Sequence, residues 1–347
     1  MKKPTSRSPW RAALGNTLLV LISVIFAVVG AEATFRALGL YTPPSRVPEP
    51  NRPDIFRGDE TLGYRLWKSS AMCYRYPVDN PEIHPVNSNS DGFRSTREYG
   101  ESDSRSHVVV VGDSFVFGMG VREEDRLTEV LESLEPTWRV HNMGMPGWGI
   151  DLMIRAIELL ASKTQPDIVA LAVYTDDFRR LLPYYAGTGY AIPKFELKDG
   201  KLLSVPYTHA IGWRRLRIAH AVYETYCGWG LRRNRFDLNE ALLNRFLEMA
   251  EQHEFEPVVL FLPGKGWTKD DQARVNFLQD WATRKEVPFL DLTERIFDAG
   301  IDETYIEGNW HWNPRGHEIA AEELHRFLKE QFYSPKNVQL IATGEPN

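Results

Sequence analysis

The chain has 347 residues, a formal net charge of -6 at pH 7 and 43% hydrophobic residues. This length and composition are typical of one sizeable α/β domain with appendages, which buries a large core without help from cross-links. The mild acidity and the lack of a long basic tract argue against nucleic acid as the main partner. The two cysteines, Cys73 and Cys227, are too few for a disulfide scaffold, whether or not they pair with each other.

The amino-terminal segment predicts a membrane anchor. An apolar run over residues 12–31 follows the basic residues Lys2, Lys3, Arg7 and Arg11. About 20 apolar residues cross a bilayer as a helix, and positive charges in front predict a cytoplasmic amino terminus (1–11) and export of the remainder of the chain. Ala31-Glu32-Ala33 also has the form of a signal-peptidase site. Because the run is long for a signal peptide, we favour an uncleaved single-pass anchor over 12–35 in a bacterial inner membrane.

The next segment, residues 36–105, changes in composition. It is rich in Pro, Asn, Asp and Arg, with Pro43-Pro44 near its start. This composition predicts a stalk that leads into irregular structure. Within it, residues 87–94 form a turn-like stretch that ends at Arg94. Arg94 is a possible substrate contact, but we expect a surface arginine that closes the turn.

From residue 106 to 335 the pattern alternates between strands and helices, and residues 336–347 form a tail. The strands are expected at Val108–Val111, Trp138–Asn142, Asp167–Val173, Pro257–Leu262 and Pro288–Leu290, and helices at Arg122–Leu134, Asp151–Ser162, Leu238–Gln252, Asp271–Arg284 and Gly316–Phe332. Strands that alternate with helices imply parallel crossovers. The sequence therefore predicts a three-layer α/β/α sandwich with a mainly parallel, flavodoxin-like sheet.

Residues 179–236 interrupt that alternation. The segment is rich in Tyr, Trp and Arg, and we interpret it as an insertion over the carboxyl edge of the sheet. Aromatic faces stack on sugars and arginines bind carboxylates, so an acidic glycan would suit such a surface. A helical pair that packs on the core or lies on the membrane is an equally good interpretation.

Four segments place reactive side chains at one edge of the predicted sheet. Gly112-Asp113-Ser114 comes directly after the first strand. This position lies near the positive end of the following helix and suits a nucleophile. The same residue types also favour plain turns. The other three segments are residues 141–149, 174–178 and 310–317. Because all four lie where parallel strands end or helices begin, their side chains can converge on one cleft.

This order of segments resembles the SGNH, or GDSL-like, hydrolase superfamily, whose members place a serine, a glycine, an asparagine and a histidine in four blocks. The resemblance covers roughly Val108 to Phe332. It implies that Ser114 is the nucleophile and His311 its base, and that the backbone N–H groups of Ser114 and Gly147 bind the oxyanion.

Two positions depart from the family pattern. Asp176 stands where the family has an asparagine that donates to the oxyanion. The acid that orients the histidine is also missing: Gly308 lies three residues before His311, and Asn309 lies at the spacing of two that related acetyltransferases use. Asn309 is the expected partner, with Glu307 or Asp302 as substitutes from the same loop. Asp113 and Asp177 are expected to support the site, and His317 to be structural.

These features predict a membrane-anchored extracytoplasmic serine esterase that removes small acyl groups, such as acetyl, from a cell-envelope glycan or a small ester. The same Ser-His pair would serve an O-acyltransferase. A degenerate domain that binds glycan or organises partners is the remaining alternative. The chain has neither a phosphate-binding loop nor metal-ligand spacing, so no cofactor and no metal are expected. Protein partners are left open.

Overall fold

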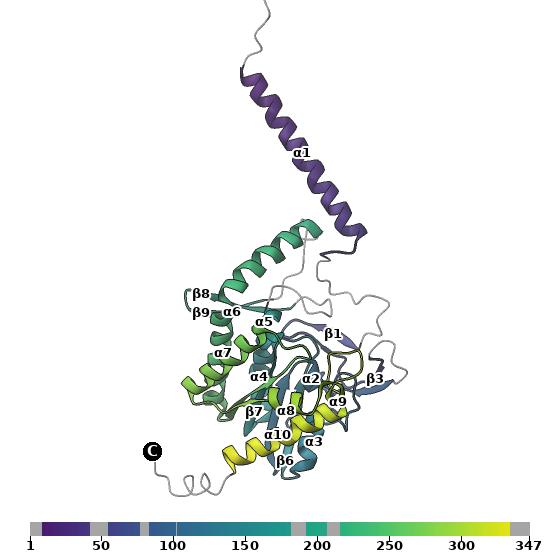
Figure 1. The fold of residues 1–347 in the computed structure, drawn as a ribbon, viewed down its shortest axis with the longest axis vertical. Helices are drawn as coiled ribbons and strands as arrows, with labels where there is room; N and C mark the ends of the chain where they lie inside the picture. The colour runs from purple at the N-terminus through teal and green to yellow at the C-terminus, as the bar shows by residue number, and fades with distance from the viewer. Residues whose placement is uncertain are drawn as a thin grey trace, which may run out of the picture.

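A five-stranded parallel sheet forms the centre of the domain (Figure 1). The computed structural model describes residues 9–41, 55–76, 83–101, 103–181, 192–206 and 216–333. The sheet strands are β5 (Ser106–Gly112), β6 (Trp138–Gly144), β7 (Ile168–Tyr174), β10 (Glu256–Leu262) and β11 (Phe289–Asp291). Their order is β11-β10-β7-β5-β6, with every neighbour parallel. This order reverses between β5 and β7, as in flavodoxin-like sheets, and confirms the predicted fold class.

Helices cover both faces of the sheet. Side chains alternate across a strand, so Val109 and Val111 of β5 belong to one apolar cluster while Val108 and Val110 belong to the other. The first cluster includes residues of α4 (Ile150–Thr164), α6 (Arg217–His253) and α7 (Lys269–Lys285). The second includes residues of α3 (Leu127–Leu134), α8 (Thr293–Asp298) and α10 (Pro314–Phe332). Short helices α2 (Ser114–Phe117), α5 (Asp177–Arg180) and α9 (Ile301–Thr304) lie between these elements.

The lead-in before the sheet is built of short antiparallel strands. Strand β1 (Phe56–Asp59) pairs with β2 (Gly63–Leu66), and β3 (Ala71–Tyr74) pairs with β4 (His84–Asn87). Buried side chains such as Tyr64, Val86 and Phe93 join these strands to the main apolar cluster. This part of the lead-in is therefore packed onto the domain.

Arg94 differs from its expected place on the surface, and that expectation was wrong. Its side chain is fully buried and donates to the carbonyl oxygens of Phe117 (3.1 Å), Gly118 (2.7 Å) and Val121 (3.0 Å). Helix α2 ends here, and carbonyl groups at a helix end have no partner within the helix. Arg94 supplies their donors and so holds the short helix that begins at Ser114.

The interrupting segment is described in part. Strands β8 (Lys194–Lys198) and β9 (Lys201–Val205) form an antiparallel pair next to α6. Most of the aromatic residues expected to bind glycan lie outside the described residues, among them Tyr184, Tyr185, Tyr190, Tyr207 and Trp213. The second half of α6 packs in the core through Leu238, Leu242 and Phe246.

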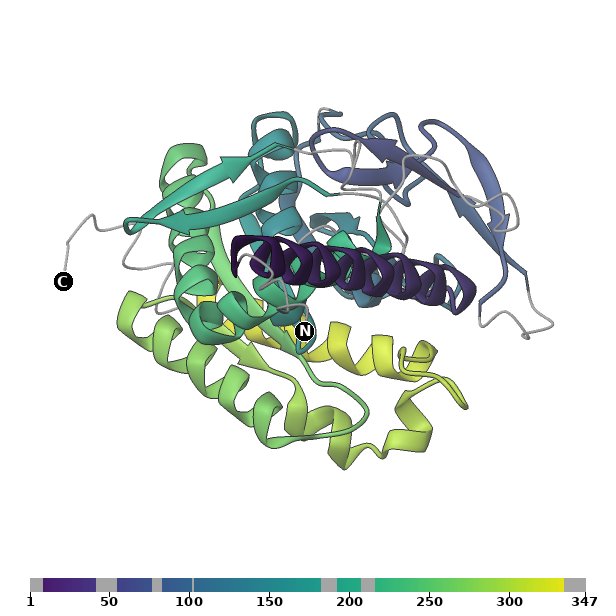
Figure 2. The same ribbon diagram turned by 90° about the horizontal axis from the view of Figure 1, so that it is seen from above.

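Helix α1 (Pro9–Ala37) stands apart from the domain and meets it at one end (Figure 1), and seen from above it projects over the middle of the domain (Figure 2). Within Ala13–Ala37, an 18-residue window reaches a mean hydropathy of 2.4 and is not buried by the rest of the chain, so the length and composition of the helix suffice to cross a membrane. Arg217 at the start of α6 donates to the carbonyl oxygens of Phe35 (2.9 Å) and Leu40 (3.0 Å). The Ile218 N–H donates to the Glu32 carboxylate at 3.0 Å. The end of α1 is thereby tied to the start of α6.

Candidate active site

Ser114 lies at the carboxyl end of β5, where the strand turns into α2. Asp113 caps this helix, because its Oδ1 accepts from the Phe115 N–H at 2.9 Å. The turn rests directly on β6: a Cβ on Gly144 would lie 2.1 Å from the Phe117 nitrogen. Ser114 is held by this close packing at the sheet edge and is only 5% exposed.

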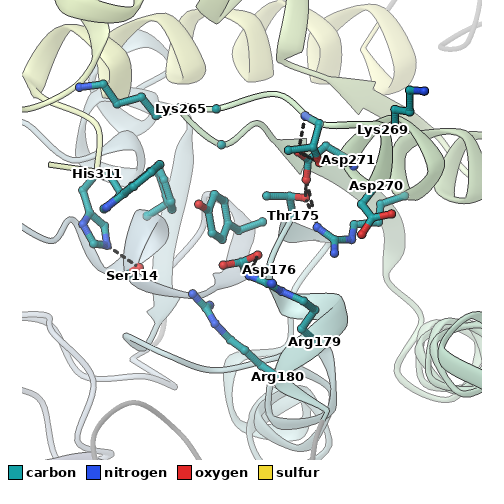
Figure 3. A pocket seen from close by; sticks show the side chains of 17 residues that line it. Ser114, Thr175, Asp176, Arg179, Arg180, Lys265, Lys269, Asp270, Asp271 and His311 are labelled. Atoms are coloured by element: carbon teal, nitrogen blue, oxygen red, sulfur yellow. Dashed lines mark hydrogen bonds and ion pairs between the residues drawn. The ribbon is translucent and has the colours of Figure 1, made fainter. Parts of the chain in front are cut away.

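His311 faces Ser114 from the loop before α10 (Figure 3). Its Nε2 lies 2.8 Å from the Ser114 Oγ, although the two residues are far apart in the chain. The loop that carries His311 is closed by a hydrogen bond from the Ile306 N–H to the His311 carbonyl at 2.9 Å. The structure thus brings the first and last predicted segments together at hydrogen-bond distance.

Asn309 contacts the other ring nitrogen of His311. Its Oδ1 lies 2.9 Å from His311 Nδ1 and accepts from the backbone N–H groups of Trp310 (2.7 Å) and His311 (3.1 Å). Because those two donors fix the amide oxygen on this side, Nδ1 must carry the ring proton. The lone pair of Nε2 then faces the Ser114 hydroxyl, which is the orientation that a general base requires.

Glu307 and Asp302, the other possible partners of His311, are both exposed. Neither is hydrogen-bonded to the His311 ring in the described part of the chain. His317 is buried on α10, where its Nδ1 accepts from the Leu127 N–H at 3.3 Å.

The surroundings of His311 favour its neutral form. The pKa of His311 is lowered to about 4, mainly by burial; the Asp113 carboxylate raises it and the Arg180 cation lowers it, both to a smaller extent. At neutral pH, and well into the acidic range, His311 is therefore mostly the neutral imidazole that can accept a proton.

A buried ion cluster supports the serine turn. Arg180 Nη1 donates to Asp113 Oδ2 at 2.7 Å, to Asp177 Oδ1 at 2.6 Å and to the Trp148 carbonyl at 3.0 Å. The side chains of Asp113 and Asp177 are completely buried. Burial raises the pKa of Asp177 well above its usual value, and the nearby Asp113 carboxylate adds to this, against the pull of Arg180. The cluster connects the turn after β5 with the turn after β7.

Asp176 and Ser114 line the same cavity, which has a volume of about 700 Å³. The Asp176 side chain is 36% exposed and pairs with Arg179 at 2.5 Å (Figure 3). An ionised carboxylate accepts hydrogen bonds and donates none, so it cannot supply the donor that an asparagine would.

Gly147 lies in the turn from Met145 to Trp148, with a φ of 83° that favours glycine. Its N–H donates to no group in the described residues, and Gly147 does not line the cavity. Its role as an oxyanion donor stays a prediction.

The remaining walls of the cavity combine an aromatic face with basic groups. Trp310 is 64% exposed beside His311, and Arg179, Lys265 and Lys269 line the cavity as well. At the far wall Arg274 donates to Thr175 (2.8 Å) and to Asp271 (3.0 Å), and Thr175 donates to Asp271. Among the described residues no group of three His, Cys, Asp or Glu side chains is placed to hold a metal.

The sequence did not point to two side chains of this site. Arg180 comes three residues after Asp177, at helical spacing, which was an available signal for their pairing. Tyr76, whose hydroxyl lies 2.9 Å from His311 Nδ1, comes from the lead-in and gave no signal.

No known family model matches the chain, and no curated protein matches it. The chain resembles G-D-S-L lipolytic proteins and esterases in fold. A lipolytic protein of the G-D-S-L family from Desulfitobacterium hafniense is 18% identical, with 65% of this chain and 100% of that chain covered and a TM-score of 0.42. The esterase EstA from Pseudoalteromonas is 10% identical, with 66% and 100% covered and a TM-score of 0.44. The acetyl xylan esterase AlAXEase is 14% identical, with 63% and 97% covered and a TM-score of 0.41. At these values the likeness is one of fold and carries nothing about the activity of this chain.

Replacing Arg180 tests the buried cluster. Arg180→Met leaves two buried carboxylates without their cation, so we expect the free energy of unfolding to fall by about 3–5 kcal/mol. The matched control is Arg179→Met, since its ion pair with Asp176 is exposed and such pairs contribute about 0–1 kcal/mol. Denaturant unfolding of the full chain in detergent, monitored by tryptophan fluorescence, measures both. Equal losses in the two variants would contradict the role of the cluster.

Proposed function

We propose that this chain is a membrane-anchored serine ester hydrolase that acts outside the cytoplasm and removes small acyl groups, such as acetyl, from a cell-envelope glycan. The observation that carries the proposal is the 2.8 Å contact between Ser114 Oγ and Nε2 of His311. A hydroxyl so placed is activated as it attacks an ester carbonyl.

The Ser114–His311 pair accounts for both halves of the reaction. His311 takes the Ser114 proton as Oγ bonds to the ester carbon, and the carbonyl oxygen becomes an oxyanion. The N–H groups of Ser114 and Gly147 are the proposed donors to that oxyanion. When the tetrahedral intermediate collapses, the ester C–O bond breaks and His311 gives its proton to the leaving alcohol. Water then attacks the acyl-serine with His311 again as base; the bond from the acyl carbon to Ser114 Oγ breaks, His311 returns the proton to Oγ, and the acid leaves.

The lining of the cavity supports a sugar ester as substrate. The exposed face of Trp310 beside His311 suits stacking against a sugar ring, and Lys265 and Lys269 suit negatively charged groups of a glycan. The apolar α1, with basic residues before it, supports a single pass through a bacterial inner membrane with the domain on the extracytoplasmic side.

An O-acyltransferase is the second proposal, and the position of Asn309 favours it, since related acetyltransferases place their acid at the same spacing of two and Asn309 contacts His311 Nδ1. The two reactions differ only in whether water or a sugar hydroxyl takes the acyl group from Ser114. A catalytically degenerate binding domain is motivated by the Asp176 carboxylate. Labelling of Ser114 by a fluorophosphonate distinguishes a working site from a degenerate one.

Ester hydrolysis tests the first proposal directly. The full chain in detergent is expected to hydrolyse p-nitrophenyl acetate, and both Ser114→Ala and His311→Ala are expected to lower kcat at least about 10³-fold, because loss of either partner disables the nucleophile. Circular dichroism must show that both variants are folded. Equal rates above background for all three proteins would rule out the Ser-His site as the source of activity.

The pKa of His311 sets the expected pH dependence. Because its pKa lies at about 4 and the base must be neutral, kcat/KM should fall to half its plateau near pH 4 and not near the ordinary 6.5. Thermal unfolding at each pH is needed as a control. The buried His141 and His317 have pKa values of about 4 and about 3, so the unfolded chain binds more protons below pH 6.5 and the fold loses stability as pH falls. A limb near pH 6.5 in folded protein would contradict the prediction.

Asp176→Asn supplies the amide donor that the family pattern has. Since one such donor contributes roughly 10²–10³ in kcat elsewhere, we expect a clear rise in kcat, toward about 10²-fold, with little change in KM. Asp270→Asn is the matched control, because it removes the same charge from the same cavity. A lower kcat in Asp176→Asn would show that the carboxylate has a role of its own.

A further inference from the structure

The Nδ1 side of His311 faces two neutral oxygens and no carboxylate among the described residues. Asn309 Oδ1 and Tyr76 Oη each lie 2.9 Å from Nδ1. Asp113 is the carboxylate that raises the pKa of the ring, and it is already engaged with Arg180. In a triad the third residue orients the imidazole and stabilises its positive charge. Here that work falls to an amide and a hydroxyl.

The directions of these hydrogen bonds are set by Asn309. Its Oδ1 is fixed by two backbone donors, so Nδ1 carries the proton and donates. A protonated Nδ1 cannot accept, so its single N–H is shared between Asn309 Oδ1 and Tyr76 Oη, each 2.9 Å away. The Tyr76 hydroxyl in turn donates to Asn309 Oδ1 at 3.4 Å. These contacts connect Tyr76, Asn309 and His311 through hydrogen bonds.

Tyr76 is suited to this position by its surroundings. Burial raises the pKa of its hydroxyl, so it stays neutral. Its ring meets the His311 ring edge to face, with centroids 5.2 Å apart and planes at 84°. It does not line the cavity, so it is placed to act on the histidine and not on the substrate.

We propose that Tyr76 is a positioning residue which, together with Asn309, replaces the missing acid of the catalytic site. As Nε2 takes the serine proton, the Tyr76 oxygen stabilises the charge on the Nδ1 side and keeps the ring aligned. The proposal rests on the proposed ester hydrolysis. It assigns to the lead-in before the sheet a direct part in the chemistry.

A double-mutant cycle on the full chain in detergent tests it, with Tyr76→Phe, Asn309→Asp and the two combined. Tyr76→Phe should lower kcat about ten-fold, the value of one hydrogen bond, and leave KM unchanged. Asn309→Asp should move the acid limb of kcat/KM upward by about one pH unit or more, because a carboxylate favours the imidazolium. With that carboxylate present, Tyr76→Phe should cost less than about two-fold.

A merely structural role would give a different result, because the cost of Tyr76→Phe would then be equal in both backgrounds. Tyr305→Phe is the matched control: its buried hydroxyl donates to the Pro263 carbonyl at 2.9 Å and does not touch His311. It should leave kcat unchanged. Equal costs in the two backgrounds, or no cost at all, would overturn the proposal.

A second measurement needs no turnover. In full-length protein labelled with ¹⁵N-histidine, the His311 Nδ1–H resonance, assigned with His311→Gln, should lie downfield and move upfield in Tyr76→Phe but not in Tyr305→Phe. If the chain hydrolyses no ester and this shift is present, the proposed function fails and the Tyr76 contact stands. An unchanged resonance would overturn the contact itself.

Discussion

The site depends on one guanidinium between two buried carboxylates. Asp113 and Asp177 come from turns after different strands, and both are fully removed from water. An isolated carboxylate in such a place is costly, so the two turns are stable in this arrangement only with Arg180 between them. The same Asp113 caps the helix that begins at Ser114, and Arg180 also binds the Trp148 carbonyl. The Arg180 cation therefore fixes the positions of three loops at the sheet edge relative to one another.

The cluster also shapes the chemistry of His311. Arg180 and burial disfavour a positive ring, whereas Asp113 favours it. Because the charge of Asp113 is shared with Arg180, the histidine experiences little net attraction for a proton. The result is a base that is ready to accept a proton at neutral pH but is weak, and the Asn309 and Tyr76 oxygens are the groups that face the charge once it forms.

Much of the fold could be predicted because its signals are local. Runs such as Val108–Val111 are typical of buried strands, and their alternation with helical patterns indicates a parallel sheet. Parallel strands end at one edge, so the segments that carry Ser114 and His311 were expected to converge, and the family resemblance paired the two residues. Arg94 and Tyr76 could not be predicted in the same way. Each acts through a contact across many residues from a segment without periodicity, and nothing local distinguishes a buried arginine or tyrosine from an exposed one. The spacing of two residues indicated that Asn309 contacts His311. That Asn309 and not Glu307 makes this contact could be known only from the geometry of the loop.

Helix α6 joins the end of α1 to the core of the domain as one helix of 37 residues, about 55 Å long at 1.5 Å per residue. A helix of this length acts as a rigid spacer, and its far half is anchored in the core through Leu238, Leu242 and Phe246. In a bilayer that α1 spans, the Ser114 cleft is consequently carried at a set height above the lipid surface. Such an enzyme would select esters by their distance from the membrane as well as by their chemistry.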